Sequence, residues 1–378
     1  MTGAVVAVDI GGTTVKASVV DELGFRRHHR TGPSRGGDDT VAVVLSLITS
    51  LREAAVADGL DVLAVGVVTP GLVDAATGTV AYASNLGWRD FDLRSALAGP
   101  LGVPVSVGHD VRAAGRAERH LGAARGADDF VLLQLGTGIA AAVVTEGTLV
   151  SGAGSAAGEA GHMPVYPDGE PCPCGKRGCL EAYAAGAAVP RRYHEALAAA
   201  SRQASPPLTA REAHPAAVPG GAVHSARAAA GAHGSGGPVG AARSGTFPTA
   251  PGAGGLADAA ARVGTAADVV RLLGVDPVAD RVWGEAVRAL GFGVSTLTML
   301  LDPALVVLGG GMAQAGDALL VPVRRTLTEL LVWREAPELR LSTLGPAAGQ
   351  WGAAIEAFAL TPSAACVATW TSPTPAIA

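Results

Sequence analysis

The sequence predicts a two-domain protein of the α/β class, and three observations support this prediction. The chain has 378 residues, which is too long for one ordinary hydrophobic core. Apolar runs with strand character alternate with runs that have helical spacing, as in layered α/β folds. Glycine-rich turns follow three of the apolar strands, at the strand end where α/β sheets bind ligands.

Residues 1–110 are expected to form the N-terminal domain, with the first glycine turn and part of the ligand site. Residues 3–21 indicate two strands around that turn, and residues 40–59 indicate a helix with an apolar stripe. Residues 61–71 and 103–110 are continuous apolar strands, which is typical of strands covered on both faces.

Residues 111–345 are expected to form a larger α/β domain that repeats the opening pattern. A helix at 111–125 precedes a strand, a glycine–threonine turn and a second strand in residues 130–144. Further helices and strands alternate at residues 281–301, 304–311, 319–333 and 338–345. A last helix, within residues 346–360, is expected to pack back on the N-terminal domain.

Two segments differ in composition from the rest of the chain. Residues 201–262 are dominated by Ala, Gly, Pro and Ser, so they bury too little apolar surface to offset their ordering entropy. We expect a disordered insertion there, with a folded element as the alternative. The tail, residues 361–378, is also expected to be disordered.

Composition excludes several classes of protein. The net charge of -5 argues against a nucleic-acid surface, and no uninterrupted apolar run has membrane-spanning length. The N-terminus lacks the basic segment of a signal peptide. Three of the four cysteines lie in one short loop, which favours a metal site in a reducing compartment. We therefore expect a cytoplasmic protein with no nucleic-acid or membrane partner.

The three glycine turns are candidate phosphate sites, because missing Cβ atoms let backbone N–H groups approach an anion. A plain tight turn is the alternative for each one. They comprise Gly11, Gly12, Thr13 and Thr14, then Gly136, Thr137 and Gly138, and finally Gly309, Gly310 and Gly311.

Two charged residues flank the first turn. Asp9 could hold Mg²⁺ through water, because magnesium gives up its water shell reluctantly. Lys16 could approach a phosphate, although an exposed strand lysine is an equal alternative.

His109 and Asp110 lie between a predicted strand and a predicted helix. Asp110 could be the N-cap of that helix, and it could also be a general base that accepts a hydroxyl proton during phosphoryl transfer. These two roles are compatible.

The segment "GEAGHMPVYPDGEPCPCGKRGCLEAY" contains the most specific motif. His162, Cys172, Cys174 and Cys179 form a closed tetrahedral set suited to structural Zn²⁺. A disulfide is the weaker alternative, because one of the three clustered cysteines would stay unpaired. The loop also carries Glu159 and Glu181, which together with His162 could converge on a polyol.

Several motifs together resemble the ROK sugar kinases, the bacterial glucokinase-like group. They are "DIGGTT", "TPGLVD", "SNLGW", "HD", "GTG", "GEAGH", "CPCGKRGCLEAY" and "VLGGG", in order from about residue 5 to residue 359. The resemblance implies the actin/hexokinase-like (ribonuclease H-like) ATPase fold, in which two α/β domains close around ATP and sugar. It also implies a homodimer or homotetramer.

The resemblance also implies roles for single residues. Asp110 is the expected catalytic base for the sugar 6-hydroxyl. The expected sugar-binding residues are Gly71, Asn85, His109, Asp110, Glu159, His162 and Glu181. The turns of Gly11 to Thr13 and Gly136 to Gly138 are expected to hold the phosphates, and Gly309 to Gly311 to lie near the adenosine.

Two departures from the family pattern bear on specificity. His109 stands where the family usually has Asn, which could shift the preference among sugars. Ala140, Ala141 and Ala142 replace glycine-rich sequence, and their methyl groups could crowd the nucleotide. Polyphosphate is therefore an alternative phosphoryl donor.

The expected function is an ATP- and Mg²⁺-dependent hexose 6-kinase, with glucose as the first substrate to test. A kinase for N-acetylglucosamine, N-acetylmannosamine, allose or an aminodeoxyglucose is the alternative. A sugar-responsive ROK regulator is less favoured, because only eight residues precede Asp9 and no basic segment replaces the DNA-binding module.

Overall fold

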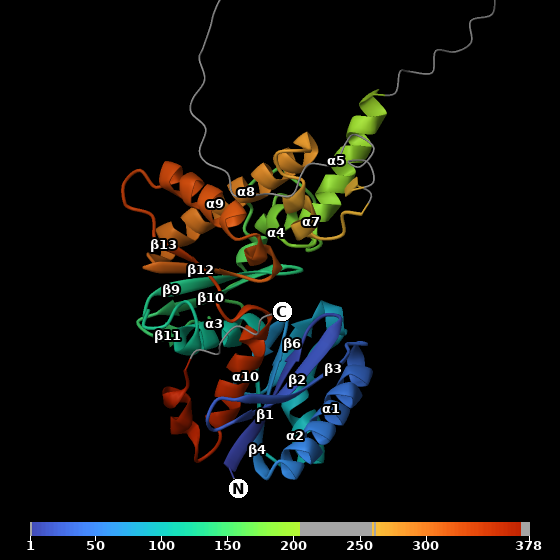
Figure 1. The fold of residues 1–378 in the computed structure, drawn as a ribbon, viewed down its shortest axis with the longest axis vertical. Coiled ribbons are helices and arrows are strands. Elements are labelled where there is room, and N and C mark those ends of the chain that lie inside the picture. The colour runs from blue at the N-terminus through green and yellow to red at the C-terminus, as the bar shows by residue number, and fades with distance from the viewer. Residues whose placement is uncertain (1, 205–258, 261, 372–378) are drawn as a thin grey trace, which may run out of the picture. The chain divides into compact units, whose positions relative to one another are not determined.

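The fold is described by a computed structural model that covers residues 2–204, 259–260 and 262–371 (Figure 1). The chain divides into a larger unit, Met1–His194 with Val263–Ala378, and a smaller unit, Glu195–Arg262. Most of the predicted insertion, residues 205–258 and 261, lies outside the described residues. Its first residues, however, are helical, because α5 (Ala188–Ala204) continues past residue 201.

The N-terminal sheet has five strands in the order β3-β2-β1-β4-β8. The first three strands pair antiparallel, and β4 and β8 join β1 in parallel. Their bounds are β1 (Thr2–Ile10), β2 (Thr14–Asp21), β3 (Arg26–Pro33), β4 (Leu60–Thr69) and β8 (Val105–His109). The glycine turn joins β1 to β2, so it lies at the edge where the parallel strands also end.

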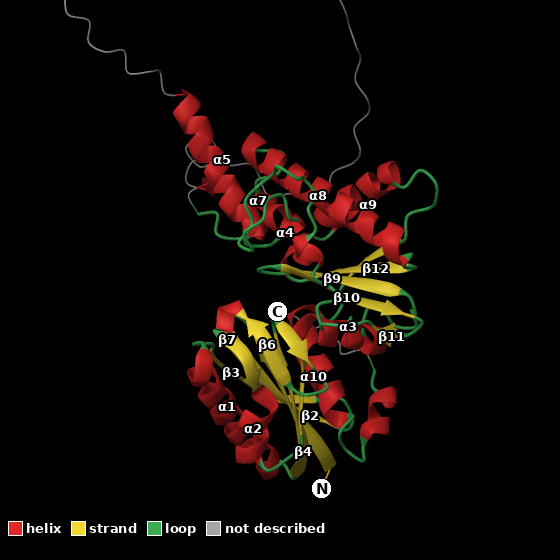
Figure 2. Ribbon diagram, turned by 180° about the vertical axis from the view of Figure 1, so that it is seen from behind, coloured by secondary structure: helices red, strands yellow, loops and turns green. Residues whose placement is uncertain are grey.

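Alternate residues of β1 enter two different cores. Val6 and Val8 pack with α1 (Gly37–Ala57) and α2 (Leu93–Leu101), whereas Val5 and Ala7 pack with α3 (Asp110–Leu121) and α10 (Ala348–Phe358). The period of two explains this division, because successive strand side chains point to opposite faces. Figure 2 shows α1 and α2 on one face of this sheet and α10 on the other.

Helix α1 is long and rich in apolar residues. Among the described residues it is the one helix whose length and hydropathy would suit a membrane span, which by itself is weak evidence. Thr40, Val44, Ile48 and Leu51 are buried against the sheet, and Asp38 and Asp39 begin the helix. The spacing of its buried residues is that of an amphipathic helix packed on a core.

A small antiparallel sheet follows β4 and was not anticipated from the sequence. It contains β5 (Leu72–Asp74), β6 (Thr79–Ala83) and β7 (Trp88–Asp92), with a 3₁₀ helix, η1 (Ser84–Leu86), before β7. Several elements of this domain are short or polar, namely the strands β3, β5, β6 and β7 and the helix α2. Their sequences therefore lack the long apolar runs that the strand prediction relied on.

The C-terminal sheet has the order β11-β10-β9-β12-β13, which repeats the topology of the first sheet strand for strand. Here too the first three strands pair antiparallel, and the last two join in parallel. The strands are β9 (Phe130–Leu135), β10 (Ile139–Thr145), β11 (Thr148–Leu149), β12 (Leu305–Gly309) and β13 (Glu338–Leu341). The sequence repeat at residues 130–144 therefore reflects a repeat of the whole sheet.

Helices cover both faces of this second sheet. Helix α3 packs against β9 and β10 on one face, with α10 beside it. Four other helices lie on the opposite face of this sheet (Figure 1). Those helices are α4 (Leu180–Ala184), α7 (Ala266–Arg271), α8 (Pro277–Leu301) and α9 (Asp317–Leu330). Short 3₁₀ helices are η2 (Ala160–His162), η3 (Gly311–Ala315), η4 (Gly345–Ala347) and η5 (Ala364–Thr369).

Helix α10 approaches β4 very closely. A Cβ atom on Gly66 would lie 1.9 Å from the carbonyl oxygen of Ala353. The same helix crosses α3 so tightly that a Cβ on Gly352 would lie 2.1 Å from the carbonyl oxygen of Ala113. Glycine at these two positions lets the last helix pack between the N-terminal sheet and α3.

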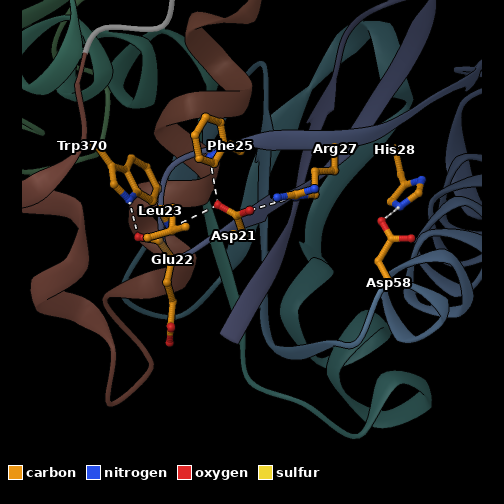
Figure 3. Close-up of polar contacts among 8 residues, drawn as sticks. All are labelled: Asp21, Glu22, Leu23, Phe25, Arg27, His28, Asp58 and Trp370. Carbon is orange, nitrogen blue, oxygen red and sulfur yellow. Dashed lines mark hydrogen bonds and ion pairs between the residues drawn. The ribbon is translucent and has the colours of Figure 1, made fainter. Parts of the chain in front are cut away.

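The expectation of a disordered tail is wrong for residues 361–371. Trp370 is 3% exposed and packs edge-on against Trp351 and Phe358. Its indole Nε1–H donates to the carbonyl oxygen of Glu22, at 3.0 Å (Figure 3). A buried tryptophan of this size outweighs the low-complexity character of its neighbours. Residues 372–378 lie outside the described part of the chain.

The turn that receives Trp370 is itself braced by a buried carboxylate. Asp21 Oδ1 accepts from the backbone N–H groups of Leu23 and Phe25, and Asp21 Oδ2 pairs with Arg27 Nε at 2.8 Å (Figure 3). In the same view His28 pairs with Asp58 at 2.7 Å. The tail therefore docks on a turn whose shape is fixed by several hydrogen bonds.

Candidate functional site

The first glycine turn lies between the ends of β1 and β2. Gly11 N–H donates to Thr14 O at 2.9 Å, and Asp9 stands opposite Lys16 in the antiparallel register. A Cβ on Gly349, at the start of α10, would lie 2.9 Å from Asp9 Oδ2. Burial, together with the charge of Asp110, raises the pKa of Asp9 to about 7, against the opposing effect of Lys16.

Asp110 is the first residue of α3, directly after β8. Burial raises the pKa of its carboxyl group to about 6, although the backbone N–H of Val111 and the Arg112 charge favour the ionised form. Val111 N–H donates to Asp110 Oδ1 at 2.7 Å. An aspartate with this pKa is ionised at neutral pH and can accept a proton from a hydroxyl group.

The N-cap of α3 is His109, so the expectation that Asp110 fills this role is wrong. His109 Nδ1 accepts from the backbone N–H of Arg112 at 3.3 Å. Burial and the Arg112 charge lower the pKa of His109 to about 4. The imidazole is therefore neutral at pH 7, and because Nδ1 accepts, its proton is on Nε2.

A cavity of about 410 Å³ contains four of the predicted sugar-binding residues. The lining residues come from two segments of the chain: Gly71 and Asn85 belong to residues 70–85, here called the first wall, and Glu159 and His162 belong to residues 156–162, the second wall. Its other lining residues are Pro70, Leu72, Tyr82, Ala83, Ser84 and Ala156. The volume falls within the range of small-molecule sites, about 300–1,000 Å³.

Gly71 is required by the shape of the first wall. Its φ of +106° is a conformation that side chains rarely adopt, and a Cβ there would lie 2.2 Å from Tyr82 O. Glycine therefore lets the Pro70–Gly71 turn pack against the end of β6.

Glu181 was predicted to bind the sugar but does not line this cavity. Its Oε2 accepts from Ile139 N–H at 2.8 Å, and a Cβ on Gly138 would lie 2.5 Å from the same oxygen. One carboxylate oxygen of Glu181 therefore binds the second glycine turn. His109 and Asp110 also do not line the cavity.

The second and third glycine turns touch each other because β9 and β12 are neighbouring parallel strands. Gly310 has a φ of +81°, and a Cβ there would lie 2.4 Å from Leu135 O. Gly136 N–H donates to Gly138 O at 3.0 Å, which closes the second turn. The two turns thus form one surface of backbone groups at the carboxyl ends of the strands.

Ala140 and Ala142 do not crowd this surface. Ala142 is fully buried, and both residues pack with the core around α3. A Cβ added to Gly115 of α3 would lie 2.4 Å from the Cβ of Ala142, so the helix and this strand are in close contact. Ala141 faces the opposite side and donates its N–H to Gly158 O at 2.7 Å. The methyl groups of Ala140 and Ala142 are thus accommodated by the core.

The structure brings His162, Cys172, Cys174 and Cys179 together, as the sequence predicted. Their ligand atoms all lie within 4.8 Å of one another, and the cysteines are free thiols. His162 Nδ1 lies 3.8 Å from Cys172 Sγ, and Cys174 Sγ lies 3.8 Å from Cys179 Sγ. A Zn–S bond of about 2.3 Å implies a tetrahedral S–S edge of about 3.8 Å, so the residues fit Zn²⁺.

Zinc binding through Nδ1 would leave Nε2 of His162 available to the cavity. The loop is held in shape by Gly178, which has a φ of +71° and approaches Tyr166 O so closely that a Cβ would lie 1.5 Å from it. The cluster of one histidine and three cysteines adjoins the cavity, because His162 belongs to both.

Sequence reasoning missed two charged residues near Asp110, of which Arg112 is buried and Glu356 is partly buried. Arg112 is 5% exposed, and Glu356 from α10 lies against Gly108, where a Cβ would be 2.4 Å from its Oε2. A usable signal was present for Arg112, because a cation in the first turn of a helix is unfavourable unless something nearby compensates it. For Glu356 the sequence gave no comparable signal.

The ROK family model matches residues 5–230 and 258–362 of the chain. A glucokinase from Halalkalibacterium halodurans is 30% identical over 360 residues, which cover 92% of each chain. The DNA-binding transcriptional dual regulator NagC from Escherichia coli is 36% identical over 132 residues, which cover 35% of this chain and 32% of NagC.

Among solved structures, a ROK family glucokinase from Streptomyces griseus in complex with glucose and AMPPNP is similar to this chain. The TM-score is 0.71 at 29% sequence identity, over 94% of this chain and 99% of that one. The two repeated sheets agree with the actin-like ATPase fold of these neighbours, so the predicted fold class is confirmed. The chain therefore belongs to the ROK family, as its motifs predicted.

Proposed function

We propose that this protein, a sugar kinase by its ROK glucokinase relatives, is an ATP- and Mg²⁺-dependent hexose 6-kinase with glucose as its first candidate substrate. The observation that carries the proposal is the cavity of about 410 Å³ shared by Asn85, Glu159 and His162, next to the helix that begins at Asp110.

The cavity offers both kinds of hydrogen-bonding group that a hexose needs. The Asn85 amide can donate and accept, the Glu159 carboxylate accepts, and the free Nε2–H of His162 donates. Each sugar hydroxyl is both a donor and an acceptor, so such a mixed set can fix the ring orientation. We assign sugar binding to these residues and to Gly71, with His109 and Glu181 at the edges of the site.

Asp110 is assigned as the general base. Its carboxylate would accept the proton of the sugar 6-hydroxyl as that oxygen attacks the γ-phosphate. The backbone N–H groups of the turns at Gly11–Thr13 and Gly136–Gly138 would bind the phosphates, and the Gly309–Gly311 turn would lie near the adenosine. Asp9 would hold Mg²⁺ through water, and this ion supplies charge neutralisation at the phosphates.

The cluster of three thiols and one imidazole is assigned a structural role. A closed tetrahedral set has no open position for an activated water, so Zn²⁺ would supply rigidity. His162 would hold the ion through Nδ1, and its Nε2–H would then have a fixed direction towards the sugar.

A coupled ADP-release assay over a panel of sugars tests this proposal. The panel contains glucose, N-acetylglucosamine, N-acetylmannosamine, allose and an aminodeoxyglucose, each with ATP and with polyphosphate as donor. We expect ATP-dependent phosphorylation of glucose with the highest kcat/KM. A higher kcat/KM for another sugar would make that sugar the assigned substrate. No turnover with any sugar of the panel would refute the proposed kinase activity.

The similarity to NagC keeps a regulatory role as the second candidate. A gel-shift assay with DNA upstream of the protein's own gene, with and without sugar, tests it. We expect no shift, because the net charge of -5 opposes contact with a polyanion. We further propose a cytoplasmic homodimer or homotetramer, which native mass measurement would check.

A further inference from the structure

Arg112 uses one guanidinium group to contact two segments that lie far from it in the sequence. Its Nη2 donates to Val73 O at 2.8 Å, and its Nη1 donates to Ser155 O at 2.9 Å. The side chain projects from the first turn of α3 and is 5% exposed. Two terminal nitrogens of one rigid planar fork therefore hold two separate backbone carbonyl groups.

Both carbonyl groups belong to neighbours of residues that line the sugar cavity. Val73 follows Leu72, which lines the first wall, and Ser155 precedes Ala156, which lines the second. The guanidinium therefore connects the two walls of the cavity without lining the cavity itself. A change in the length of this connection would change the spacing between Asn85, which belongs to the first wall, and Glu159, which belongs to the second.

The backbone at Ser155 supports this view. Its φ is +56°, a left-handed conformation that is uncommon for a residue with a side chain. Such conformations persist where the surroundings determine them, and they gather at ligand sites. The hydrogen bond from Arg112 is one of the interactions that hold the Ser155 carbonyl in this direction.

A buried cation at this position is costly, so it requires compensation. Burial lowers the pKa of Arg112, while the charges of Glu356, Asp110 and Glu159 oppose that effect. The helix dipole adds to the cost, because Arg112 lies in the first turn of α3. An apolar residue would avoid these penalties if packing were the only requirement.

We propose that Arg112 is a positioning residue that fixes the spacing of the two walls of the sugar cavity through its paired hydrogen bonds to Val73 and Ser155. This inference rests on the proposed sugar-kinase function. It assigns Arg112 to sugar affinity and leaves the nucleotide turns unaffected, because neither carbonyl belongs to a glycine turn.

The test compares Arg112→Lys and Arg112→Gln with the matched controls Arg119→Lys and Arg119→Gln. Lysine keeps the charge but has only one nitrogen, so it cannot reproduce the planar fork. Arg119 lies on the same helix and pairs with Asp128 at 2.6 Å, away from the cavity. Kinetics with glucose and ATP, glucose titration calorimetry and thermal unfolding are measured for each.

We expect both Arg112 variants to raise the glucose KM and Kd by about 10- to 100-fold, as for the loss of hydrogen bonds from a charged group. The ATP KM should stay within about twofold, because neither carbonyl group belongs to a glycine turn, and a loss of folded protein would lower the apparent kcat and leave both KM values unchanged. The Arg119 variants should retain both constants. Unchanged glucose affinity in a folded Arg112→Lys protein would overturn the inference.

The unmodified protein gives a second readout if the Arg112 variants do not fold. Hydrogen exchange at the amide of Ala157, two residues after Ser155, should be slow without sugar, because this N–H donates to Ser151 O at 3.1 Å in a wall that is already held. Rapid exchange at Ala157 would also overturn the inference. If the unmodified protein bound no sugar at all, the proposed function would fail first, and this outcome is distinct from unchanged affinity in the variants.

Discussion

Glu181 accepts a hydrogen bond from the backbone N–H of Ile139, with an Oε2–N distance of 2.8 Å. This bond joins the helix that follows the last cysteine of the metal cluster to the second glycine turn. A loop that we assign to sugar binding is thereby connected to a turn that we assign to phosphate binding.

We expect Glu181→Ala to raise the KM for both glucose and ATP, because it frees the Ile139 N–H and the α4 end together. Glu181→Gln keeps an oxygen acceptor for Ile139, so its ATP KM should remain close to that of the unmodified enzyme. Steady-state kinetics in both substrates check this. An ATP KM that rises equally in the two variants would contradict the role of this hydrogen bond.

Asp110→Asn should lower kcat by about 10²- to 10⁴-fold, because an amide cannot accept the hydroxyl proton. Glucose binding should persist, because the amide of Asn can still hydrogen-bond the 6-hydroxyl and Asn85, Glu159 and His162 remain in the cavity. Calorimetry and turnover measured on the same preparation separate the two effects. Near-normal turnover in this variant would show that another group is the base.

The activity should depend on pH through Asp110, and protonation of Asp9, whose pKa is raised to about 7, should add to the same acidic decline. Because burial raises the pKa of this carboxyl group to about 6, its protonated form accumulates as the pH falls through that value. kcat should therefore be highest above pH 7 and decline below pH 6, as measured with a buffer series at saturating substrates.

His109 cannot produce this decline, since its pKa is lowered to about 4. His109→Asn keeps a side-chain acceptor for the N-cap of α3, so the protein should fold and show the same acidic limb. Its relative kcat/KM across the sugar panel should change, because Asn, with its Oδ1 capping α3, presents an NH2 group with two donors where His109 offers the single Nε2–H. An unchanged sugar preference would exclude His109 as a specificity residue.

Removal of the metal should weaken sugar binding before it abolishes nucleotide binding. Cys172→Ser and Cys179→Ser each delete one thiolate, so stoichiometric zinc should be lost and the glucose Kd should rise. Cys366→Ser is the matched control, because Cys366 lies outside the cluster. Elemental analysis with calorimetry gives the readout, and retained glucose affinity in a zinc-free protein would refute the structural role of the cluster.

Trp370→Ala should destabilise the protein by about 3–5 kcal/mol, as for other large buried aromatic residues. The cost combines the lost packing on Trp351 and Phe358 with the lost hydrogen bond to Glu22. Val332→Ala is the control, because Val332 is 88% exposed and its change should be within about 0.5 kcal/mol. Urea unfolding measures both, and equal stability would mean that the tail does not contribute to the fold.

Local features of the sequence were enough for several parts of this structure. The glycine turns follow β1, β9 and β12 because strand ends and tight turns are encoded by adjacent residues. The metal cluster could also be predicted, since three of its ligands lie within one short loop. The same local patterns carried the family and the fold class.

Tertiary structure decided what depends on segments that are distant in the chain. Arg112 contacts carbonyl groups 39 and 43 residues away, and Trp370 contacts Glu22 across 348 residues. Such contacts have no periodic signature, because they arise only when separate sheets and helices pack together. The sequence by itself thus determined the family and the candidate groups for the chemistry, while packing determined which of them share one cavity and what holds its walls.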